Sequence, residues 1–205
     1  MLRKYQLNFK LNLQDYSSVQ LFSEFITSFR PELERCPSCN AVGRCRRYGH
    51  YGRSLTDYDH GKVIDLRIKV PRVMCSCGHT HGAIPDHIVP YRWYSLPFIL
   101  HILDLYFSGA MTIEAMFEEF GFSHSTLYRW ISVYAEHKIW WLGALQSDRT
   151  TAIAFLTILF GYPVFSDLTR RFFLKTLRSF LQSHANPANC DHLPPGWLPV
   201  QGAPT

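Results

Sequence analysis

The sequence lacks an apolar run long enough to cross a membrane. Its longest predominantly apolar segment, residues 152–165, contains 14 residues, among them Gly161 and Pro163, whereas a membrane-spanning helix needs about 20. The two basic residues near the start are followed by alternating polar and apolar residues, not by the continuous apolar stretch of a secretory signal. We therefore expect a cytoplasmic protein without a membrane partner.

The motifs of several enzyme classes are absent as well. The chain has no P-loop, no GxGxxG sequence and no Ser-His-Asp pattern, so we expect no enzymatic activity and no small-molecule substrate. Charged residues make up only 18% and apolar residues 47%, which excludes a disordered chain, a coiled coil and a collagen. A length of 205 residues allows one domain or two small ones.

The charge is distributed unevenly along the chain. The net charge is +5, but residues 36–95 carry 9 basic and 4 acidic residues, whereas residues 96–147 carry 2 basic and 5 acidic residues. A basic block of this kind favours a polyanionic partner. A solvated basic face is the alternative interpretation.

Apolar periodicity predicts both strands and helices. Alternation predicts strands at residues 5–13 and 63–70, the second with a charged outer face. Helical spacing predicts a helix over residues 16–29, ended by Pro31. The apolar stripe of that helix would consist of Val19, Phe22, Phe25, Ile26 and Phe29.

Two closely spaced cysteine pairs form the strongest motif. Residues 36–39 read CPSC, and residues 75–77 read CSC. Two such pairs, separated by a segment with strand character, indicate a zinc ribbon, in which four thiolates hold a structural zinc ion and leave no open position. The gap between the pairs exceeds the usual spacing of about 15–20 residues, so His79 or His81 could replace one thiolate. A redox CxxC and reduced thiols without a metal are the alternatives. The predicted zinc ligands are Cys36, Cys39, Cys75 and Cys77.

The sequence after the cysteine pairs has a helical pattern. Residues 97–108 form a predicted helix that Gly109 ends. Thr112 has the position of an N-cap for a second helix, which Gly121 ends, and Ser123 has the position of an N-cap for a third. Two short helices, a glycine turn and a capped following helix indicate a helix-turn-helix.

This unit predicts contacts with double-stranded DNA. The second helix of such a motif enters the major groove with its N-terminal residues on base edges, where Arg129 could pair with guanine O6 and N7. The unit is acidic overall, so arginines of the ribbon would supply the phosphate contacts that the helix lacks. A plain helical hairpin is the alternative, and a homodimer is a second partner that the motif allows. The predicted DNA-contacting residues are His124, Ser125, Tyr128, Arg129, Arg46 and Arg47.

The order of these motifs resembles a known family. A CPxC ribbon, a strand ending in VPRVMC, the sequence GHTHGAIPDHIVPY and a helix-turn-helix with STLYRW resemble an uncharacterised bacterial domain family found beside or within mobile elements. That family is similar to the N-terminal DNA-binding region of insertion-sequence transposases, and the resemblance covers about residues 30–145. It implies zinc binding through the four cysteines and DNA binding through the helical unit.

A catalytic half of such a transposase is not expected in this chain. Its chemistry needs three acidic residues that hold two metal ions. After residue 137 only Asp148, Asp167 and Asp191 are acidic, and no strand pattern separates them. A metal-dependent nuclease is therefore a weaker hypothesis than a DNA-binding protein without a catalytic domain.

These observations predict an α+β fold, with a small β zinc ribbon followed by a mostly α-helical helix-turn-helix region. We expect a zinc-stabilised DNA-binding protein, a transposase-related accessory protein or regulator; a protein–protein interaction module built on the ribbon is the alternative. The predicted organisation is an N-terminal strand and helix (1–35), a zinc ribbon (36–94), a helix-turn-helix (95–145), C-terminal helices (146–183) and a disordered tail rich in proline and glycine (184–205).

Overall fold

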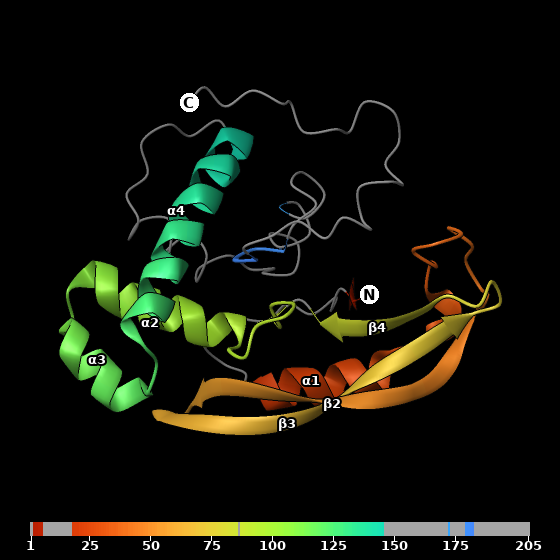
Figure 1. The fold of residues 1–205 in the computed structure, drawn as a ribbon, viewed down its shortest axis with the longest axis horizontal. Helices are drawn as coiled ribbons and strands as arrows, with labels where there is room; N and C mark the ends of the chain where they lie inside the picture. Colours follow the sequence, from red (N-terminus) through yellow and green to blue (C-terminus); the bar gives the residue numbers. More distant parts are fainter. Residues whose placement is uncertain (1, 6–17, 86, 146–171, 173–178, 183–205) are drawn as a thin grey trace.

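The computed structural model describes residues 2–5, 18–85, 87–145, 172 and 179–182. Four strands form one sheet in the order β1-β4-β3-β2, in which β1 is parallel to β4 and the other pairs are antiparallel. Helix α1 lies along the sheet, and α2, α3 and α4 gather at one end of it (Figure 1). The described residues therefore form a mixed α and β fold, as predicted. The elements are β1 (Leu2–Tyr5), α1 (Ser18–Ser28), a 3₁₀ turn (Pro31–Leu33), β2 (Cys45–Asp59), β3 (Lys62–Cys75), β4 (Thr80–Pro85), α2 (Leu96–Ser108), α3 (Ile113–Phe120) and α4 (His124–Leu145).

The long β2–β3 hairpin forms the largest part of the sheet. His60 and Gly61 connect its strands with φ angles of 47° and 78°, and Asp59 pairs with Lys62. Positive φ at both central residues is the geometry of a two-residue turn whose twist matches that of the strands. The strand predicted at residues 63–70 is confirmed and extends to Cys75. β2 was not predicted, because its first half is basic and contains two glycines.

Most of the predicted stripe of α1 packs against the sheet, since Phe22 and Ile26 are partly buried against the same cluster as Phe25 and Phe29. Leu21, Phe25 and Phe29 are buried, whereas Val19 is 44% exposed. Because Leu21 and Phe25 are four residues apart, they share one face, and Val19 lies about 200° around the helix from Leu21. The assignment of Val19 to the apolar stripe was therefore wrong.

Asp57 of β2 joins the starts of α1 and α2 to the sheet. Its side chain is 1% exposed and accepts hydrogen bonds from the backbone N–H of Ser18, at 3.1 Å, and from the hydroxyl of Ser95. The Ser95 oxygen in turn accepts from the backbone N–H of Phe98 at 3.0 Å and caps α2. The starts of α1 and α2 are thereby both fixed to β2.

Helices α2, α3 and α4 share one core. α2 buries residues around most of its circumference, among them Phe98, Leu100 and Leu103, and these pack with Leu127 and Trp130 of α4. The predicted boundaries are confirmed: Gly109 and Gly121 end α2 and α3 with φ angles of 67° and 68°, and Thr112 caps α3. No helix among the described residues is both long and apolar enough to span a membrane.

Several predictions fall on residues that the structure does not describe. The predicted strand at residues 5–13 lies outside the described residues except for Tyr5, which ends β1. Of the predicted C-terminal helices, only residues 172 and 179–182 are described, and the predicted tail lies wholly outside. Phe172, Phe180 and Leu181 are buried in the core of α2–α4.

Candidate metal centre and nucleic-acid interface

The structure brings the four predicted cysteines together. The Sγ atoms of Cys36 and Cys77 are 3.7 Å apart, as are those of Cys39 and Cys75, and all four lie within 4.8 Å of one another. A tetrahedral site with metal–sulfur bonds of about 2.3 Å has sulfur–sulfur edges of about 3.8 Å. The donor set and its spacing therefore fit a metal ion held by four thiolates.

Two tight turns position these sulfurs. In the first turn, the backbone N–H of Asn40 donates to Cys36 O at 2.9 Å, and Asn40 takes a φ of 60°. In the second, at the β3–β4 junction, the N–H of Gly78 donates to Cys75 O at 2.9 Å. Each turn folds two cysteines of one pair towards the same point, which is what a CxxC or CxC sequence needs to chelate.

The thiols around this point differ in acidity. The pKa of Cys75 is lowered to about 6, chiefly because a backbone hydrogen bond from Cys77 stabilises the thiolate, although burial opposes it. Cys45 lies opposite Cys75 in the β2–β3 ladder, and burial, followed by the charge of Cys75, raises its pKa to about 11. Cys45 is thus a core residue with a raised pKa beside the cluster. Hydrogen bonds with Cys39, Cys75 and Cys36 raise the pKa of Cys77, so the four neighbouring thiols share protons rather than ionising together.

Neither histidine of the GHTH sequence joins the four sulfurs. The cluster contains four cysteines and neither His79 nor His81. The buried His81 side chain instead places Nε2 4.0 Å from a carboxylate oxygen of Glu34, itself buried. The geometry therefore favours four cysteine ligands over a site in which a histidine replaces one cysteine.

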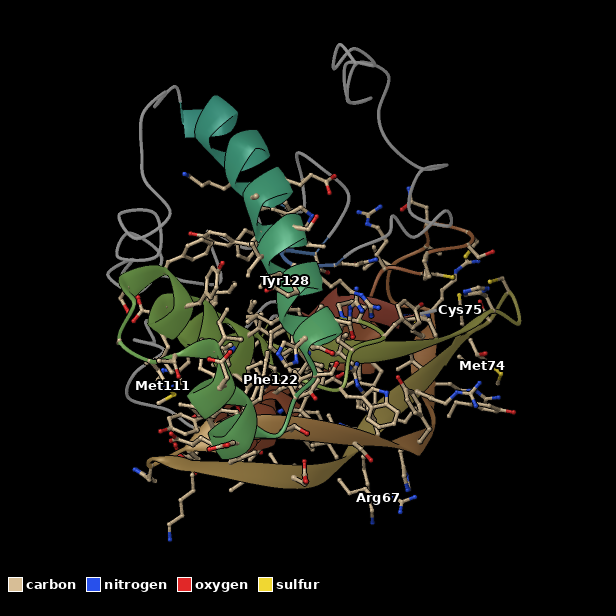
Figure 2. The ribbon with its side chains drawn as sticks, turned by 60° about the vertical axis from the view of Figure 1, so that its left-hand side comes forward. Arg67, Met74, Cys75, Met111, Phe122 and Tyr128 are labelled. Carbon is tan, nitrogen blue, oxygen red and sulfur yellow. The ribbon has the colours of Figure 1, made fainter. Side chains whose placement is uncertain are left out.

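The predicted DNA-contacting residues of α4 are exposed at its N-terminal end. His124, Ser125, Tyr128 and Arg129 all face solvent, whereas Leu127 between them is fully buried. Tyr128, in the lower half of α4 in Figure 2, is 53% exposed. The core residues hold this helix rigidly and leave a continuous polar face along its first two turns.

Contacts at the turn before α4 fix this face further. The hydroxyl oxygen of Ser123 accepts from the backbone N–H of Thr126 at 3.4 Å, as predicted for an N-cap, and its own contact with the Ser125 hydroxyl is 3.0 Å. The ring of His124 packs on that of Phe117 from α3, with centroids 3.7 Å apart. The start of α4 is therefore anchored to α3 through the glycine turn.

Arg46 and Arg47 lie at the other end of the sheet. Both are exposed near the start of β2, next to the cysteine cluster and away from α3 and α4 (Figures 1 and 2). Arg47 donates to the backbone oxygen of Phe29 at 3.2 Å and lies over the Phe29 ring, so part of its donor capacity serves the fold. The structure does not bring these arginines together with the face of α4.

A basic aromatic loop that was not predicted lies beside α4. Residues 91–93 read YRW, and Trp93 is 75% exposed. Burial lowers the pKa of Arg92, and the nearby positive charge of Arg129 lowers it further. The two arginines thus come from different segments to one surface. The signal in the sequence was a basic residue between two aromatic ones, which is equally common in a packed loop.

Comparison with known proteins identifies one family. Residues 36–130 match a family described as a domain of unknown function (DUF6431), and the match covers less than half of the chain. It runs from the first cysteine of the cluster to Trp130 and so includes β2, β3, β4, α2, α3 and the first turns of α4. No curated protein and no solved structure matches the chain.

Proposed function

We propose that this protein is a zinc-stabilised reader of double-stranded DNA. The single observation that carries the proposal is the start of α4, where exposed polar residues follow a capped glycine turn while Leu127 and Trp130 fix the helix in the core. In a helix-turn-helix this is the part of the second helix that reaches base edges. α3 and α4 take those roles here.

Zinc is the metal that suits the four-sulfur cluster best. Four cysteine thiolates in a closed arrangement are typical of structural zinc, and such a site leaves no position for a substrate. Zinc supplies a cross-link when bound. The ligands Cys36 and Cys39 come from the turn after α1, and Cys75 and Cys77 come from the β3–β4 turn, so the cross-link would join segments about 40 residues apart. The sheet half would then be a zinc ribbon.

Base and phosphate contacts would be divided between residues. Arg129 is exposed and would pair with guanine in the major groove. His124, Ser125 and Tyr128 lie on the same exposed stretch. Arg92 would bind a phosphate, because it lies near Arg129 on the adjoining loop. Arg46 and the remaining capacity of Arg47 would contact phosphates farther along a duplex.

The resemblance to the DNA-binding region of transposases supports a role connected with mobile elements. We propose that the chain acts as an accessory protein or regulator without its own catalytic domain. The matched family carries no assigned activity that would add to this.

Fluorescence anisotropy with labelled duplex DNA tests the proposal. We expect affinity that falls steeply as salt rises, because each phosphate contact releases counterions. Arg129→Ala should cost about 1–3 kcal/mol on the preferred sequence and less on others. Arg46→Ala should weaken all sequences alike and reduce the salt slope by about 0.9.

Arg30→Ala is the matched control. Arg30 is an exposed arginine just after α1, and it donates to the backbone oxygens of Thr27 and Phe29. Its loss should therefore leave the affinity for DNA unchanged. Affinity that is independent of salt, or equal losses in the Arg129 and Arg30 variants, would refute DNA reading by α4. A stable protein partner without DNA affinity would then favour the interaction module.

A further inference from the structure

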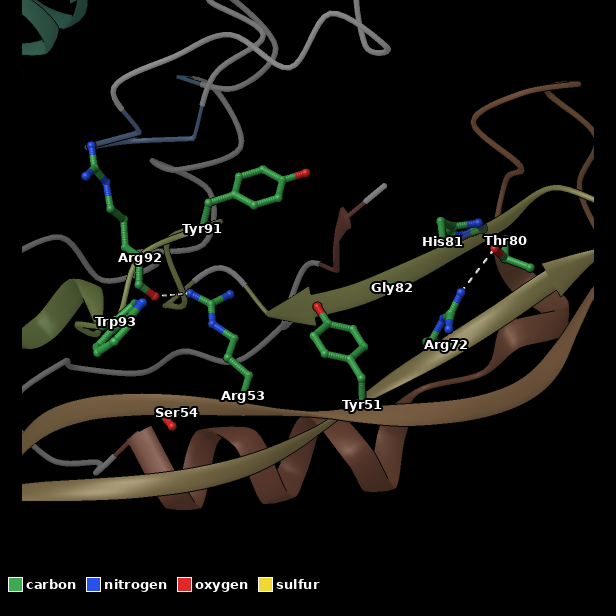
Figure 3. Close-up of a pocket in the computed structure, with 10 residues that line it drawn as sticks. All are labelled: Tyr51, Arg53, Ser54, Arg72, Thr80, His81, Gly82, Tyr91, Arg92 and Trp93. Carbon is green, nitrogen blue, oxygen red and sulfur yellow. Dashed lines mark hydrogen bonds between the residues drawn. The ribbon is translucent and has the colours of Figure 1, made fainter.

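A pocket with a volume of about 690 Å³ is lined by residues of three strands and of the loop before α2. It lies over β2, β3 and β4, and the loop of residues 91–93 covers one side (Figure 3). Small-molecule sites usually have volumes of about 300–1,000 Å³. The pocket is therefore large enough for a ligand of the size of a nucleotide.

The floor of the pocket is cationic. Arg53 and Arg72 line it together with Tyr51, and none of the described residues that line it is acidic. Figure 3 shows the Tyr51 ring between the two guanidinium groups. Arg72 donates one hydrogen bond to the hydroxyl of Thr80 at 3.3 Å, and a guanidinium has five donors in all. An anion fits this surface.

The two terminal nitrogens of the Arg53 guanidinium differ in their contacts. Its Nη2 donates to the backbone oxygen of Val89 at 2.6 Å and to that of Arg92, so it holds the loop against β2. Its Nη1 is buried and has no hydrogen-bond partner among the described residues. A buried donor without a partner costs free energy. Solvent does not reach this nitrogen, so an anion in the pocket would be attracted by the charge of Arg53 rather than bound by Nη1 directly.

The rim of the pocket is aromatic. Tyr91 and Trp93 are 65% and 75% exposed, although large aromatic side chains are normally buried. Tyr91 takes a φ of 59°, a left-handed conformation that is uncommon for such a residue and is found preferentially at binding sites. The loop thus adopts an unfavourable backbone conformation that leaves two aromatic rings exposed at the mouth of a cationic pocket. The planar ring of a ligand can stack on them.

We propose that this pocket binds a 5′-phosphorylated nucleoside, with the phosphate on Arg72 beside the positive charge of Arg53 and the base against Tyr91 and Trp93. The ligand is either a free nucleotide or the unpaired nucleotide at the end of a DNA strand. Both present the same phosphate and the same aromatic ring. The proposal stands apart from duplex reading by α4, because none of its contacts involves the exposed face of that helix.

Titration calorimetry with deoxyadenosine monophosphate, deoxyadenosine and inorganic phosphate tests the pocket. We expect the monophosphate to bind at least about tenfold more tightly than either fragment, and Arg72→Gln to weaken it about tenfold. Trp93→Ala should weaken the monophosphate but not inorganic phosphate. Arg67→Gln is the matched control, because Arg67 is an exposed arginine of β3 that does not line the pocket and points away from it in Figure 2.

Arg72→Gln leaves the buried half of Arg53 intact, so circular dichroism of this variant should match that of the unmodified protein. Absence of binding by all three compounds, together with no preference for a 5′-phosphorylated overhang over a blunt duplex, would overturn the proposal. So would inorganic phosphate that binds as tightly as the monophosphate, or equal losses in the Arg72 and Arg67 variants.

Two DNA probes distinguish the sources of the ligand. A duplex with a short 5′-phosphorylated overhang is compared with a blunt duplex of the same sequence. A preference for the overhang that Arg72→Gln abolishes identifies a strand end as the ligand, while a response of the free monophosphate alone identifies a free nucleotide; either supports the pocket. A blunt duplex has no unpaired nucleotide, so its affinity reports on α4 and on the phosphate contacts of Arg92, Arg46 and Arg47. The two proposals therefore fail separately.

Discussion

Loss of the metal should unfold one half of this protein and leave the other half folded. The perturbation is Cys39→Ser, chosen because the Cys39 side chain is exposed and its replacement leaves no cavity in the core. The remaining sulfurs cannot hold the site without a cation.

The free energy lost with the metal should exceed the stability of the part of the fold around the cysteines. A structural zinc contributes about 10–16 kcal/mol to a small module, whereas whole domains are stable by about 5–15 kcal/mol. The apolar cluster beside the site is small: α1 provides Leu21, Phe25 and Phe29, and the sheet adds little more than Val73 and Ala83 to the buried cysteines. It shares no buried residue with the core of α2, α3 and α4, so unfolding should stop before that core.

Hydrogen exchange measured by mass spectrometry checks this prediction. In Cys39→Ser, amides of residues 36–47 and 72–83 should lose protection, while those of residues 98–105 and 127–134 should keep it. Ser38→Ala is the control, since Ser38 is an exposed residue of the same turn that supplies no ligand. Protection lost equally throughout the described residues, or kept throughout, would refute the division of the fold into a metal-dependent and an independent half.

Three further substitutions test separate parts of the fold. Asp57→Asn removes one of the two acceptors for Ser18 and Ser95 and should cost about 1.5–3 kcal/mol in urea unfolding; a change below the error of the method would contradict the role of Asp57. Gly121→Ala forces a side chain into a φ of 68° and should cost about 1–2 kcal/mol, whereas an unchanged unfolding midpoint would contradict this. Burial lowers the pKa of His101, so the unfolded chain binds a proton more readily than the folded protein, and stability should fall as the pH drops below about 6.5. His101→Phe should reduce the fall in unfolding free energy between pH 7 and pH 5. An equal fall in the variant would exclude His101 as its source.

Features encoded by short segments could be predicted from the sequence. The ends of α2 and α3 at Gly109 and Gly121 and the cap at Thr112 follow from local backbone preferences. The strand at residues 63–70 follows from its alternation, since one face packs and the other meets water. The four cysteines could be grouped because two tight turns each bring a pair of sulfurs to one point.

Features that depend on distant partners could not be predicted. β2 is held by its pairing with β3 over its whole length, and its own residues carry only a weak alternation. Asp57 is a charged residue in the interior, where its type is rarely found, and only the approach of Ser18 and Ser95 explains it. The pocket joins β2, β3 and β4 to a loop, so no single segment contains its pattern.

The spacing of these parts bears on how DNA could be held. Cys75 of the cluster and Met74, the strand partner of Arg46, lie at one end of the sheet, and α4 rises from the other end (Figure 2). Since the hairpin between them has strands of 14 and 15 residues that rise about 3.3 Å per residue, its length is about 45–50 Å, or somewhat more than one turn of duplex DNA. A single duplex that touches both ends must therefore run along the sheet for more than a helical turn. The YRW loop, which lies between these ends and beside Arg129, is the place where such a duplex would meet the protein a third time.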